Sequence, residues 1–582
     1  MNILGISFEQ HDAGAAMVVD GKIIASVNEE RFTRFKMDNA APIESIKYCL
    51  VASNLKPSDI DIIVMSGFKF WKKIWFFGNY YRKEALFTRF RGISFFMRLK
   101  NGEFNYFSGF KAIIVNLLAM TGIPSLVVLY LVRYLKIKKT LFGFKGKWLW
   151  VDHHVGHMAS NYYTSGFKNC LSIVIEGTDW INTMVVDRIE EGKITNICAS
   201  PWPHSAGYFY GLITMLLGFN PYSHAGKITG LSSFGDPNTA MCEVKKLMWV
   251  EGMELRLSPN VFTFRNYYVK HKKLPPELET YTKEELSAAF QANLENCILE
   301  IVKQAVEITK MENITLSGGV SANVKLNQKI HNLPNVKNIY IFPAMSDAGQ
   351  AVGVALYVAA QFDDIKEPIQ LNNVYLGPHY SDVEIEKYLK QMNVKYIKMN
   401  SVAKNIARLL ANGAVVARFT GRIEYGPRAL GNRSIFYQTS DPGVNDWLNK
   451  RLKRTEFMPF APMSLAEETD KLYLNTKGAE YAARFMTITF SCTNWMKKNC
   501  PAVVHVDGTA RPQFVDNKYN PDSYEILKEY YMLTGIPAII NTSFNMHGEP
   551  IVLTPQNAIN SFLHGSLDYL AIGPFLVKHP NN

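Results

Sequence analysis

Two histidines four positions apart are the clearest candidates for metal chemistry in this sequence. His153 and His157 lie in the segment Asp152–His157, and on a helix they would share one face. Far downstream, Asp347 could deliver a carboxylate as a third ligand. Two imidazoles and one carboxylate leave coordination positions open for water or phosphate oxygens, which is compatible with Fe(II), Zn or Mn. A histidine pair at this spacing is more often structural, so the spacing alone leaves the metal site a hypothesis.

A second candidate is the arginine- and glycine-rich segment Gly421–Ser434. It contains Arg422, Arg428 and Arg433 and directly follows an apolar run at residues 414–419, which predicts a buried strand that ends in a loop. Planar guanidinium groups on such a loop suit a phosphate or a carboxylate, because glycine lets backbone N–H groups approach the anion. A solvated loop with surface arginines is the alternative.

Two shorter segments could also carry chemistry. Gly318 and Gly319 lie between a predicted strand and a helix start, where bare backbone N–H groups can bind an anion or a nucleotide. The structural alternative is a tight turn. His11 beside Asp12 follows the first predicted strand and is a candidate general base, with a capping or core histidine as the alternative. Lys36 follows in what could equally be a solvated helix end.

The elements that must position these residues repeat along the first half of the chain. Short apolar segments predict strands at residues 3–7, 14–19 and 22–28, and again at 171–176 and 183–188. Asp20-Gly21 predicts a hairpin turn. A repeated start of this kind is the mark of the sugar-kinase/actin-type ATPase fold.

Further elements follow downstream. Residues 286–309 predict a helix, and residues 313–316 a short strand before the double glycine. The pattern resets at residues 361–364, and a new unit with its own strands and helices begins near Tyr375. We therefore expect two or three domains, as the length of 582 residues also indicates.

Composition indicates an ordinary globular protein, with 47% hydrophobic and 20% charged residues. The seven cysteines are scattered and lack metal-type spacing, which favours reduced thiols in a cytoplasmic protein. The first residues form a predicted strand instead of a secretory signal. We therefore expect a cytoplasmic location, with membrane association left open.

The positive charge is confined to one segment. Residues 69–147 hold 16 Lys and Arg against two acidic residues, a net charge of +14, whereas the rest of the chain carries −2. This pattern argues against a protein-wide nucleic-acid surface. Residues 112–135 superficially resemble a membrane span, but Pro124 interrupts them. We expect a pair of basic amphipathic helices here, packed on the protein or touching a membrane surface or an acceptor.

Together these residues give the chain a resemblance to the NodU/CmcH family of O-carbamoyltransferases, which carbamoylate hydroxyl groups of antibiotics, nodulation factors and other natural products. Only residues 69–147 stand outside the resemblance, as a variable insertion. The matching stretches are His11–Ala16, Glu29–Phe32, Asp152–Ser160, Gly226–Leu231, Gly318–Asn323, Pro343–Gly349, Gly421–Ser434, Pro459–Pro462, His505–Pro512 and Asn541–Val552.

The resemblance implies an α/β fold with two domains. Residues 1–365 would form a duplicated actin/sugar-kinase-like (ASKHA) domain, related to the tRNA threonylcarbamoyl transferases, with residues 69–147 as a helical basic insertion. Residues 366–582 would form a YrdC-like α/β domain. In the family, the C-terminal site takes carbamoyl phosphate and releases carbamate, which ATP converts to carbamoyl-adenylate. This intermediate passes internally to a metal-containing N-terminal site, where an acceptor hydroxyl attacks it.

The resemblance also assigns roles to individual residues. His153, His157, Asp347 and Glu176 would bind the metal, for which Fe(II) is favoured over Zn or Mn. His11 would be the base for the acceptor hydroxyl, and Lys36 would contact the carbamoyl donor. The nucleotide would be held by Lys227, Gly230, Gly318, Gly319 and Asn323. The carbamoyl phosphate site would be lined by Arg418, Arg428, Lys453, Arg454, Arg511, Asn541, Asn545 and His547.

Several positions depart from the pattern of the family. Glu176 stands where many members have aspartate, and glutamate can still bind metal or a metal-bound water. Met458 and His547 replace arginines, and Leu452 replaces a lysine. Neighbouring Lys453 or Arg454 would compensate for the missing charge. The donor site is therefore less closely matched than the nucleotide site.

Two alternatives remain beside an ATP-dependent O-carbamoyltransferase. One is an enzyme like the tRNA threonylcarbamoyl transferases, and the other is a non-catalytic relative that binds a membrane or a partner through residues 69–147. The leading interpretation predicts a small-molecule or glycan acceptor with a free hydroxyl, no nucleic acid, and a membrane-surface contact through the insertion. It leaves a homodimer open.

Overall fold

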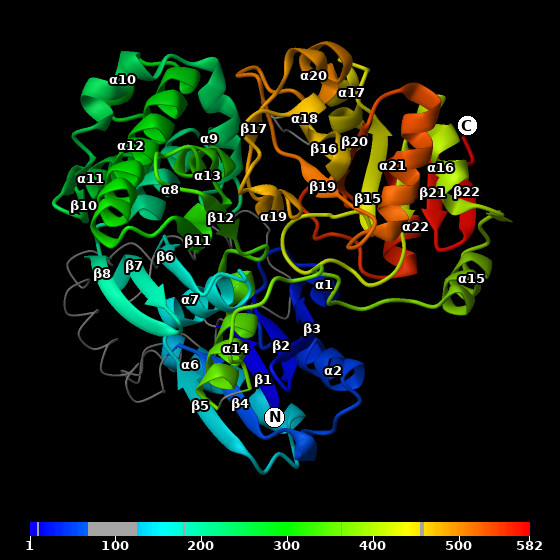
Figure 1. Cartoon of the computed structure of the whole chain (residues 1–582), viewed down its shortest axis with the longest axis horizontal. Helices are drawn as coiled ribbons and strands as arrows, with labels where there is room; N and C mark the ends of the chain where they lie inside the picture. The colour runs from blue at the N-terminus through cyan, green and yellow to red at the C-terminus, as the bar shows by residue number, and fades with distance from the viewer. Residues whose placement is uncertain (9–10, 68–124, 178–180, 363, 454–458, 582) are drawn as a thin grey trace.

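A five-stranded sheet forms the N-terminal end of the chain (Figure 1). The computed structural model describes residues 1–8, 11–67, 125–177, 181–362, 364–453 and 459–581. The order in this sheet is β3-β2-β1-β4-β5. The strands are β1 (Asn2–Ser7), β2 (Gly14–Val19), β3 (Lys22–Asn28), β4 (Ile62–Ser66) and β5 (Lys147–Val151). The predicted strands are confirmed, and so is the hairpin, whose central residues Asp20 and Gly21 both have positive φ.

A second five-stranded sheet repeats this arrangement. Its order is β12-β11-β6-β7-β8. In both sheets the first three strands in sequence pair antiparallel, and the two later strands join parallel at the side of the first. The predicted duplication is therefore present in the topology. The strands are β6 (Asn169–Ile175), β7 (Asn182–Glu190), β8 (Lys193–Pro201), β11 (Asn313–Ser317) and β12 (Asn338–Ile341).

Two helices lie between these sheets. Helix α7 (His153–Tyr163) contacts β6 and β11, α14 (Gln350–Gln361) contacts β1 and β2, and the two helices contact each other. Other helices cover the second sheet, in the upper left of Figure 1. They include α8 (Ala206–Leu216), α9 (Ala225–Leu231), α12 (Lys283–Thr309) and α13 (Val324–His331). Helix α12 begins one turn earlier than its apolar pattern predicts, because Thr282 and Glu285 form a capping box.

The first sheet packs on α2 (Ile43–Ala52) and α6 (Ser125–Thr140). Helix α6 starts at Ser125, inside the apolar run at residues 112–135 that resembled a membrane span. Among the described residues, no helix is both long enough and apolar enough to cross a bilayer. Residues 68–124, which hold most of the predicted basic insertion, lie outside the described residues.

The C-terminal part contains an eight-stranded mixed sheet in the order β13-β22-β21-β14-β15-β20-β16-β19. Helices α16 (Val402–Ala411) and α21 (Pro521–Thr534) pack on it and on each other. The predicted strand after residue 414 is β14, which is buried throughout. The strands are β13 (Ile397–Lys398), β14 (Val416–Phe419), β15 (Arg433–Gln438), β16 (Ala461–Leu465), β19 (Gln513–Val515), β20 (Ala538–Ser543), β21 (Tyr569–Ile572) and β22 (Phe575–Lys578).

Direct polar contacts join the two parts. Arg31, in the short helix α1 (Glu30–Thr33), donates to the Gly426 carbonyl at 2.8 Å. Arg34 donates to the carbonyls of Pro550 and Ile551 at 2.6 and 2.7 Å. On another side, the Lys325 ammonium lies 2.9 Å from the Asp507 carboxylate. The protein is thus a mixed α/β structure whose C-terminal loops are held against N-terminal elements.

Candidate functional site

Four buried side chains converge at the start of α7. They are His153, His157, Glu176 and Asp347, and one potential ligand atom from each lies within 4.8 Å of all the others. His153 Nε2 and His157 Nε2 lie 3.3 and 3.4 Å from the same Asp347 oxygen, Oδ1. His157 Nε2 also lies 3.0 Å from Glu176 Oε1. Helical spacing brings the two histidines together as predicted. Glu176 directly follows β6, and Asp347 begins the short 3-10 turn that precedes α14.

The orientation of these groups fits a cation better than mutual hydrogen bonding. Nε2 of both histidines and Oδ1 of Asp347 are buried and make no hydrogen bond, although they lie close together. Burial by itself lowers the pKa of His157, but the carboxylates of Glu176 and Asp347 outweigh this and raise the pKa to about 9. A buried set of two imidazoles and two carboxylates is a donor set for Zn, Mn or Fe(II).

His11 lies at the edge of this cluster. Its Nε2 is 3.7 Å from Asp347 Oδ2, and its Nδ1 is 3.0 Å from Asp12 Oδ2. Ser346 donates to the same Asp12 oxygen at 3.2 Å, so the histidine loop and the Asp347 loop are tied together. The predicted donor contact Lys36 is exposed in a turn whose neighbour, Asp38, accepts a backbone hydrogen bond from Ala13.

Glu176 connects the cluster to the double-glycine turn. The Gly319 N–H donates to Glu176 Oε1 at 2.6 Å, the oxygen that also faces His157. Gly318 has φ +93, and a Cβ there would lie 2.3 Å from the carbonyl oxygen of Ile175. The strand-to-helix turn therefore borders the metal cluster directly.

The other predicted nucleotide residues lie next to this turn. Asn323 caps α13, where its side chain accepts from the Leu326 N–H, and it exchanges hydrogen bonds with Gln291. Tyr210 bonds Gln291 and also Thr229 of α9, which joins α9 to the turn. The remaining two predicted residues, Lys227 and Gly230, are buried on α9. The side chain of Asn323 is thus occupied by structural bonds, while the turn and α9 face the same region.

The arginine loop differs from the initial interpretation, because two of its three arginines hold the protein together. Arg422 donates to the carbonyls of Gly377, Ile24 and Leu376 and to Tyr48. Arg433 is completely buried and donates to three loop carbonyls. Its guanidinium also stacks 3.7 Å from the centre of the Phe419 ring. The interpretation of these two side chains as anion ligands is therefore corrected.

A buried glutamate shapes the same loop. Glu424 Oε1 accepts the backbone N–H groups of Leu430, Asn432 and Arg433 at 2.8, 2.8 and 3.1 Å. Glu424 was not among the predicted site residues, although its position between two arginines is a signal that marks it. Its bonds fix the course of the backbone around Arg428.

Arg428 and Arg418 are the arginines that remain available for an anion. Burial lowers the pKa of Arg428 to about 10, its Nε is buried without a hydrogen bond, and it has no ion pair within the described part of the chain. Arg418 is 3% exposed, and its Nη2 lies 3.4 Å from Asp522 Oδ2. Its Nη1 is buried and lacks a hydrogen bond. Two desolvated guanidinium groups with unused donors are typical of a phosphate or carboxylate site.

The other predicted donor-site residues divide into two groups. Asn541 is buried on β20, with its amide bonded to Gln513 and to the Ala429 carbonyl of the arginine loop. The side chain of Asn545 is bonded within its own loop. Arg511 is partly buried, whereas Lys453 and His547 are exposed. The position that many relatives fill with lysine, Leu452, is buried here at 1% exposure, and Arg454 and Met458 lie outside the described residues.

The metal cluster and the arginine loop share one wall. Tyr425 donates to the Ala348 carbonyl, one residue after Asp347. Gly426 packs so closely on the same segment that a Cβ would lie 3.0 Å from the Pro343 carbonyl oxygen. The loop that carries Arg428 therefore rests on the loop that carries a candidate metal ligand.

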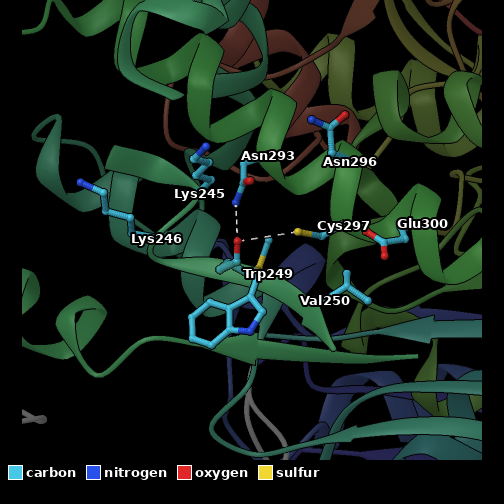
Figure 2. A pocket seen from close by; sticks show the side chains of 9 residues that line it. Lys245, Lys246, Trp249, Val250, Asn293, Asn296, Cys297 and Glu300 are labelled. Carbon is cyan, nitrogen blue, oxygen red and sulfur yellow. Dashed lines mark hydrogen bonds between the residues drawn. The ribbon is translucent and has the colours of Figure 1, made fainter. Parts of the chain in front are cut away.

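A separate surface cavity of about 560 Å³ lies over α12 and β9 (Met248–Glu251), as Figure 2 shows. Asn293 and Cys297 hold its floor through bonds to the Met248 carbonyl. None of the predicted site residues lines it. Its lining consists of Lys245, Lys246, Met248, Trp249, Val250, Asn293, Asn296, Cys297 and Glu300.

Comparison with known proteins gives the site its context. The family models described as Carbamoyltransferase N-terminus and Carbamoyltransferase C-terminus match residues 2–356 and 407–579. An uncharacterised protein of Methanocaldococcus jannaschii is 31% identical over 99% of both chains. Nodulation protein NolNO of Sinorhizobium fredii is 30% identical, over 98% of this chain and 79% of its own length. Nodulation protein NolO of Bradyrhizobium diazoefficiens is 31% identical over 74% of this chain and 79% of its own. Because both family models match and relatives align over nearly the full length, this chain belongs to the carbamoyltransferase family of enzymes.

Proposed function

We propose that the chain is an ATP-dependent O-carbamoyltransferase with two cooperating sites. Water would split carbamoyl phosphate into carbamate and phosphate at the C-terminal site. Carbamate and ATP would then give carbamoyl-adenylate and pyrophosphate. Attack by an acceptor hydroxyl would form the O-carbamoyl product and release AMP. The observation that carries this proposal is the shared wall between the arginine loop and the Asp347 loop.

The proposed domains follow the arrangement of the sheets. Residues 1–365 would be an ASKHA-type domain with residues 69–147 as a basic insertion, a proposal that the matching order of the two N-terminal sheets supports. Residues 366–582 would be the YrdC-like domain that receives the donor. We place the enzyme in the cytoplasm, with a small-molecule or glycan hydroxyl as the acceptor and no role for nucleic acid.

The donor site would work through buried positive charge. The guanidinium groups of Arg428 and Arg418 are held in a low-dielectric environment, where their attraction for a phosphate oxyanion is stronger than in water. Glu424 keeps the loop in the required shape through three backbone N–H bonds. Because these groups are fixed before the donor arrives, little reorganisation is needed when it binds.

At the N-terminal site, four side chains fit a divalent metal. His153, His157, Glu176 and Asp347 would hold it, and we favour Fe(II), with Zn and Mn as the other candidates for this donor set. When bound, a divalent cation supplies Lewis acidity toward phosphoryl and carbonyl oxygens. Glu176 also receives the Gly319 N–H, so the nucleotide turn is aligned with the cluster through this chain's own residues.

His11 is positioned to remove the proton from the acceptor hydroxyl. Burial lowers the pKa of His11, but the carboxylates of Asp347 and Asp12 outweigh this and raise it to about 10, so the ring is protonated while Asp347 keeps its full charge. A divalent cation held by Asp347 would offset that charge, and an Nδ1–H group that donates to Asp12 would then leave the Nε2 lone pair available to accept the proton. Asp12 is itself held by Ser346, so the imidazole is oriented by a bonded pair. The ring lies beside the metal cluster, where the carbamoyl carbon of the adenylate would be presented.

The test separates the two sites. Metal-loaded protein is incubated with carbamoyl phosphate and ATP, and phosphate, pyrophosphate and AMP are measured with and without a panel of hydroxylated glycans. We expect phosphate and pyrophosphate from the donor steps, and AMP once an acceptor is supplied. Release of AMP only with tRNA and threonine would overturn the proposal in favour of a threonylcarbamoyl transferase.

A further inference from the structure

Helix α6 exposes an apolar stripe on the side opposite to its packed face. Tyr130, Ile137 and Leu141 are at most 9% exposed and join the core under the first sheet. Three apolar side chains on the opposite side are exposed to solvent instead. Val132, Leu135 and Phe142 are 46, 61 and 89% exposed. Lys139 lies on the same helix face as Val132 and Leu135, and Phe142 lies in the turn that directly follows the end of α6 at Thr140.

Positive charge surrounds this stripe. Residues 129–151 contain no acidic side chain, and the five lysines around Phe142 are exposed. Two acids border this region: the backbone of Asp61 bonds the Lys147 N–H, and the carboxylate of Asp38 acts on Arg133 on the inner face of α6. The patch therefore stays strongly positive, and it belongs to residues 69–147, a segment whose own net charge is +14. The exposed lysines are Lys136, Lys138, Lys139, Lys145 and Lys147.

The inner face of α6 contacts the loop that carries the proposed acceptor base. The guanidinium of Arg133 donates to the carbonyl of Phe8 at 3.3 Å and to Asn39 Oδ1 at 3.0 Å. The ring of Phe8 stacks on that of Tyr130 with a centroid distance of 5.2 Å. One helix thus joins the exposed patch on its outer side to the segments that flank His11 on its inner side.

We propose that this patch docks on a bilayer surface that contains anionic phospholipid. Exposed phenylalanine and leucine side chains beside lysines match the interface of such a bilayer, where apolar groups enter the headgroup region and ammonium groups meet phosphates. A nucleic acid would match the lysines but would leave Leu135 and Phe142 without apolar partners. Docking here orients the His11 side of the enzyme relative to the membrane. The acceptor class is then a hydroxyl on a membrane-borne molecule, a part of the inference that rests on the proposed function.

Vesicle binding tests the docking surface without any substrate. The full chain is sedimented with vesicles of neutral phospholipid alone or mixed with anionic phospholipid, at low and high salt. We expect binding to the anionic vesicles only, and weaker binding at high salt. The double variant Leu135→Ser/Phe142→Ser should bind anionic vesicles at least about tenfold more weakly, because it removes two side chains that can insert into the bilayer. The variant Lys139→Glu/Lys145→Glu should lose affinity for anionic vesicles by a similar factor, because it replaces two positive charges with negative ones.

The chain offers a matched control on α12. Ile308 is 64% exposed, a fraction similar to the 61% of Leu135, and Lys303 is exposed on the same helix as Ile308. The variant Ile308→Ser/Lys303→Glu should bind vesicles like the unmodified chain. Thermal melting checks that all variants are folded. Equal losses in the control and the α6 variants, no binding to anionic vesicles, or displacement from vesicles by tRNA at low concentration would each overturn the docking surface.

A further variant separates this inference from the proposed reaction. His157→Ala removes a candidate metal ligand but leaves α6 unchanged, so it should bind anionic vesicles like the unmodified chain. Docking with no carbamoyl transfer by the metal-loaded enzyme would refute the proposed function and leave the surface standing. Transfer to a soluble acceptor without docking would refute the surface alone.

Discussion

The substitution Arg428→Met separates binding of an anion from stability of the fold. Arg428 has a buried Nε without a hydrogen bond, and burial lowers its pKa to about 10. The charged form is therefore disfavoured in the folded protein, and at neutral pH the side chain stays charged at a cost in folding free energy. Methionine keeps the apolar length of the side chain and removes the charge. We expect Arg428→Met to stabilise the protein in the absence of a donor.

The magnitude follows from the pKa. Compared with the ordinary arginine pKa above about 12, a pKa of about 10 corresponds to roughly 3 kcal/mol. Water reaches part of the side chain and reduces this value, so we expect a gain of about 1 to 2 kcal/mol. An anion that pairs with Arg428 offsets the same cost. The unmodified chain should therefore gain about 2.7 kcal/mol with ligand at roughly one hundred times its Kd, and Arg428→Met should gain much less.

Urea unfolding with and without carbamoyl phosphate or inorganic phosphate measures both effects. Arg422→Met is the matched control, because Arg422 lies on the same loop but donates to three carbonyls and to Tyr48. That variant should lose about 2 kcal/mol or more of stability and keep its response to the ligand. If Arg428→Met is destabilised and still responds to phosphate as the unmodified chain does, Arg428 is not an anion ligand and the reasoning is wrong.

Three further predictions concern the metal cluster and the contacts between the two parts. His157→Ala removes one of four converging ligand atoms, so metal content measured after purification should fall to background while phosphate release from carbamoyl phosphate continues; joint loss of both would contradict two separate sites. Gly426 has φ +111, and the variant Gly426→Ala would place a Cβ 3.0 Å from the Pro343 carbonyl oxygen. We expect this variant to lower the free energy of unfolding by about 1 to 3 kcal/mol. An unchanged urea midpoint would show that the two loops can move apart to accept the methyl group. Burial alone raises the pKa of Asp507, but His505 and Lys325 outweigh it and lower the pKa, so this carboxylate stabilises the fold above about pH 4 and the stabilisation is lost as the pH falls. The loss of stability on acidification should be smaller for Asp507→Asn, and equal acid sensitivity would contradict this contact.

Local patterns predicted much of this architecture. The antiparallel strands, the hairpin at Asp20-Gly21 and the pairing of His153 with His157 depend on neighbouring residues, and a sequence displays those directly. The order of the sheets could be expected because the strand pattern repeats. Asp347 was a candidate from its residue type alone, whereas the resemblance to a family was needed to add Glu176, because no spacing argument connects either carboxylate to the histidines.

The roles of the loop arginines could not be predicted from residue types. Arg422 bonds the Ile24 carbonyl, 398 positions away, and backbone carbonyls leave no trace in a sequence. Arg433 lies over Phe419 on the paired strand, so its burial follows from strand register. Glu424 was overlooked for the related reason that its partners are backbone N–H groups of its own loop. The residue types indicated an anion-binding loop, but they did not indicate which of its arginines bond backbone carbonyls and which one is left for an anion.

The contacts of Arg31 and Arg34 have a consequence for how the protein is made. Their acceptors, at Gly426 and Ile551, follow 395 and 517 positions later in the chain. Because a ribosome adds roughly 5 to 20 residues per second, both guanidinium groups wait about 20 to 100 seconds before their partners exist. The nascent N-terminal part must stay soluble during this interval with a docking edge uncovered. Synthesis past Ile551 is therefore the earliest moment at which both contacts can form.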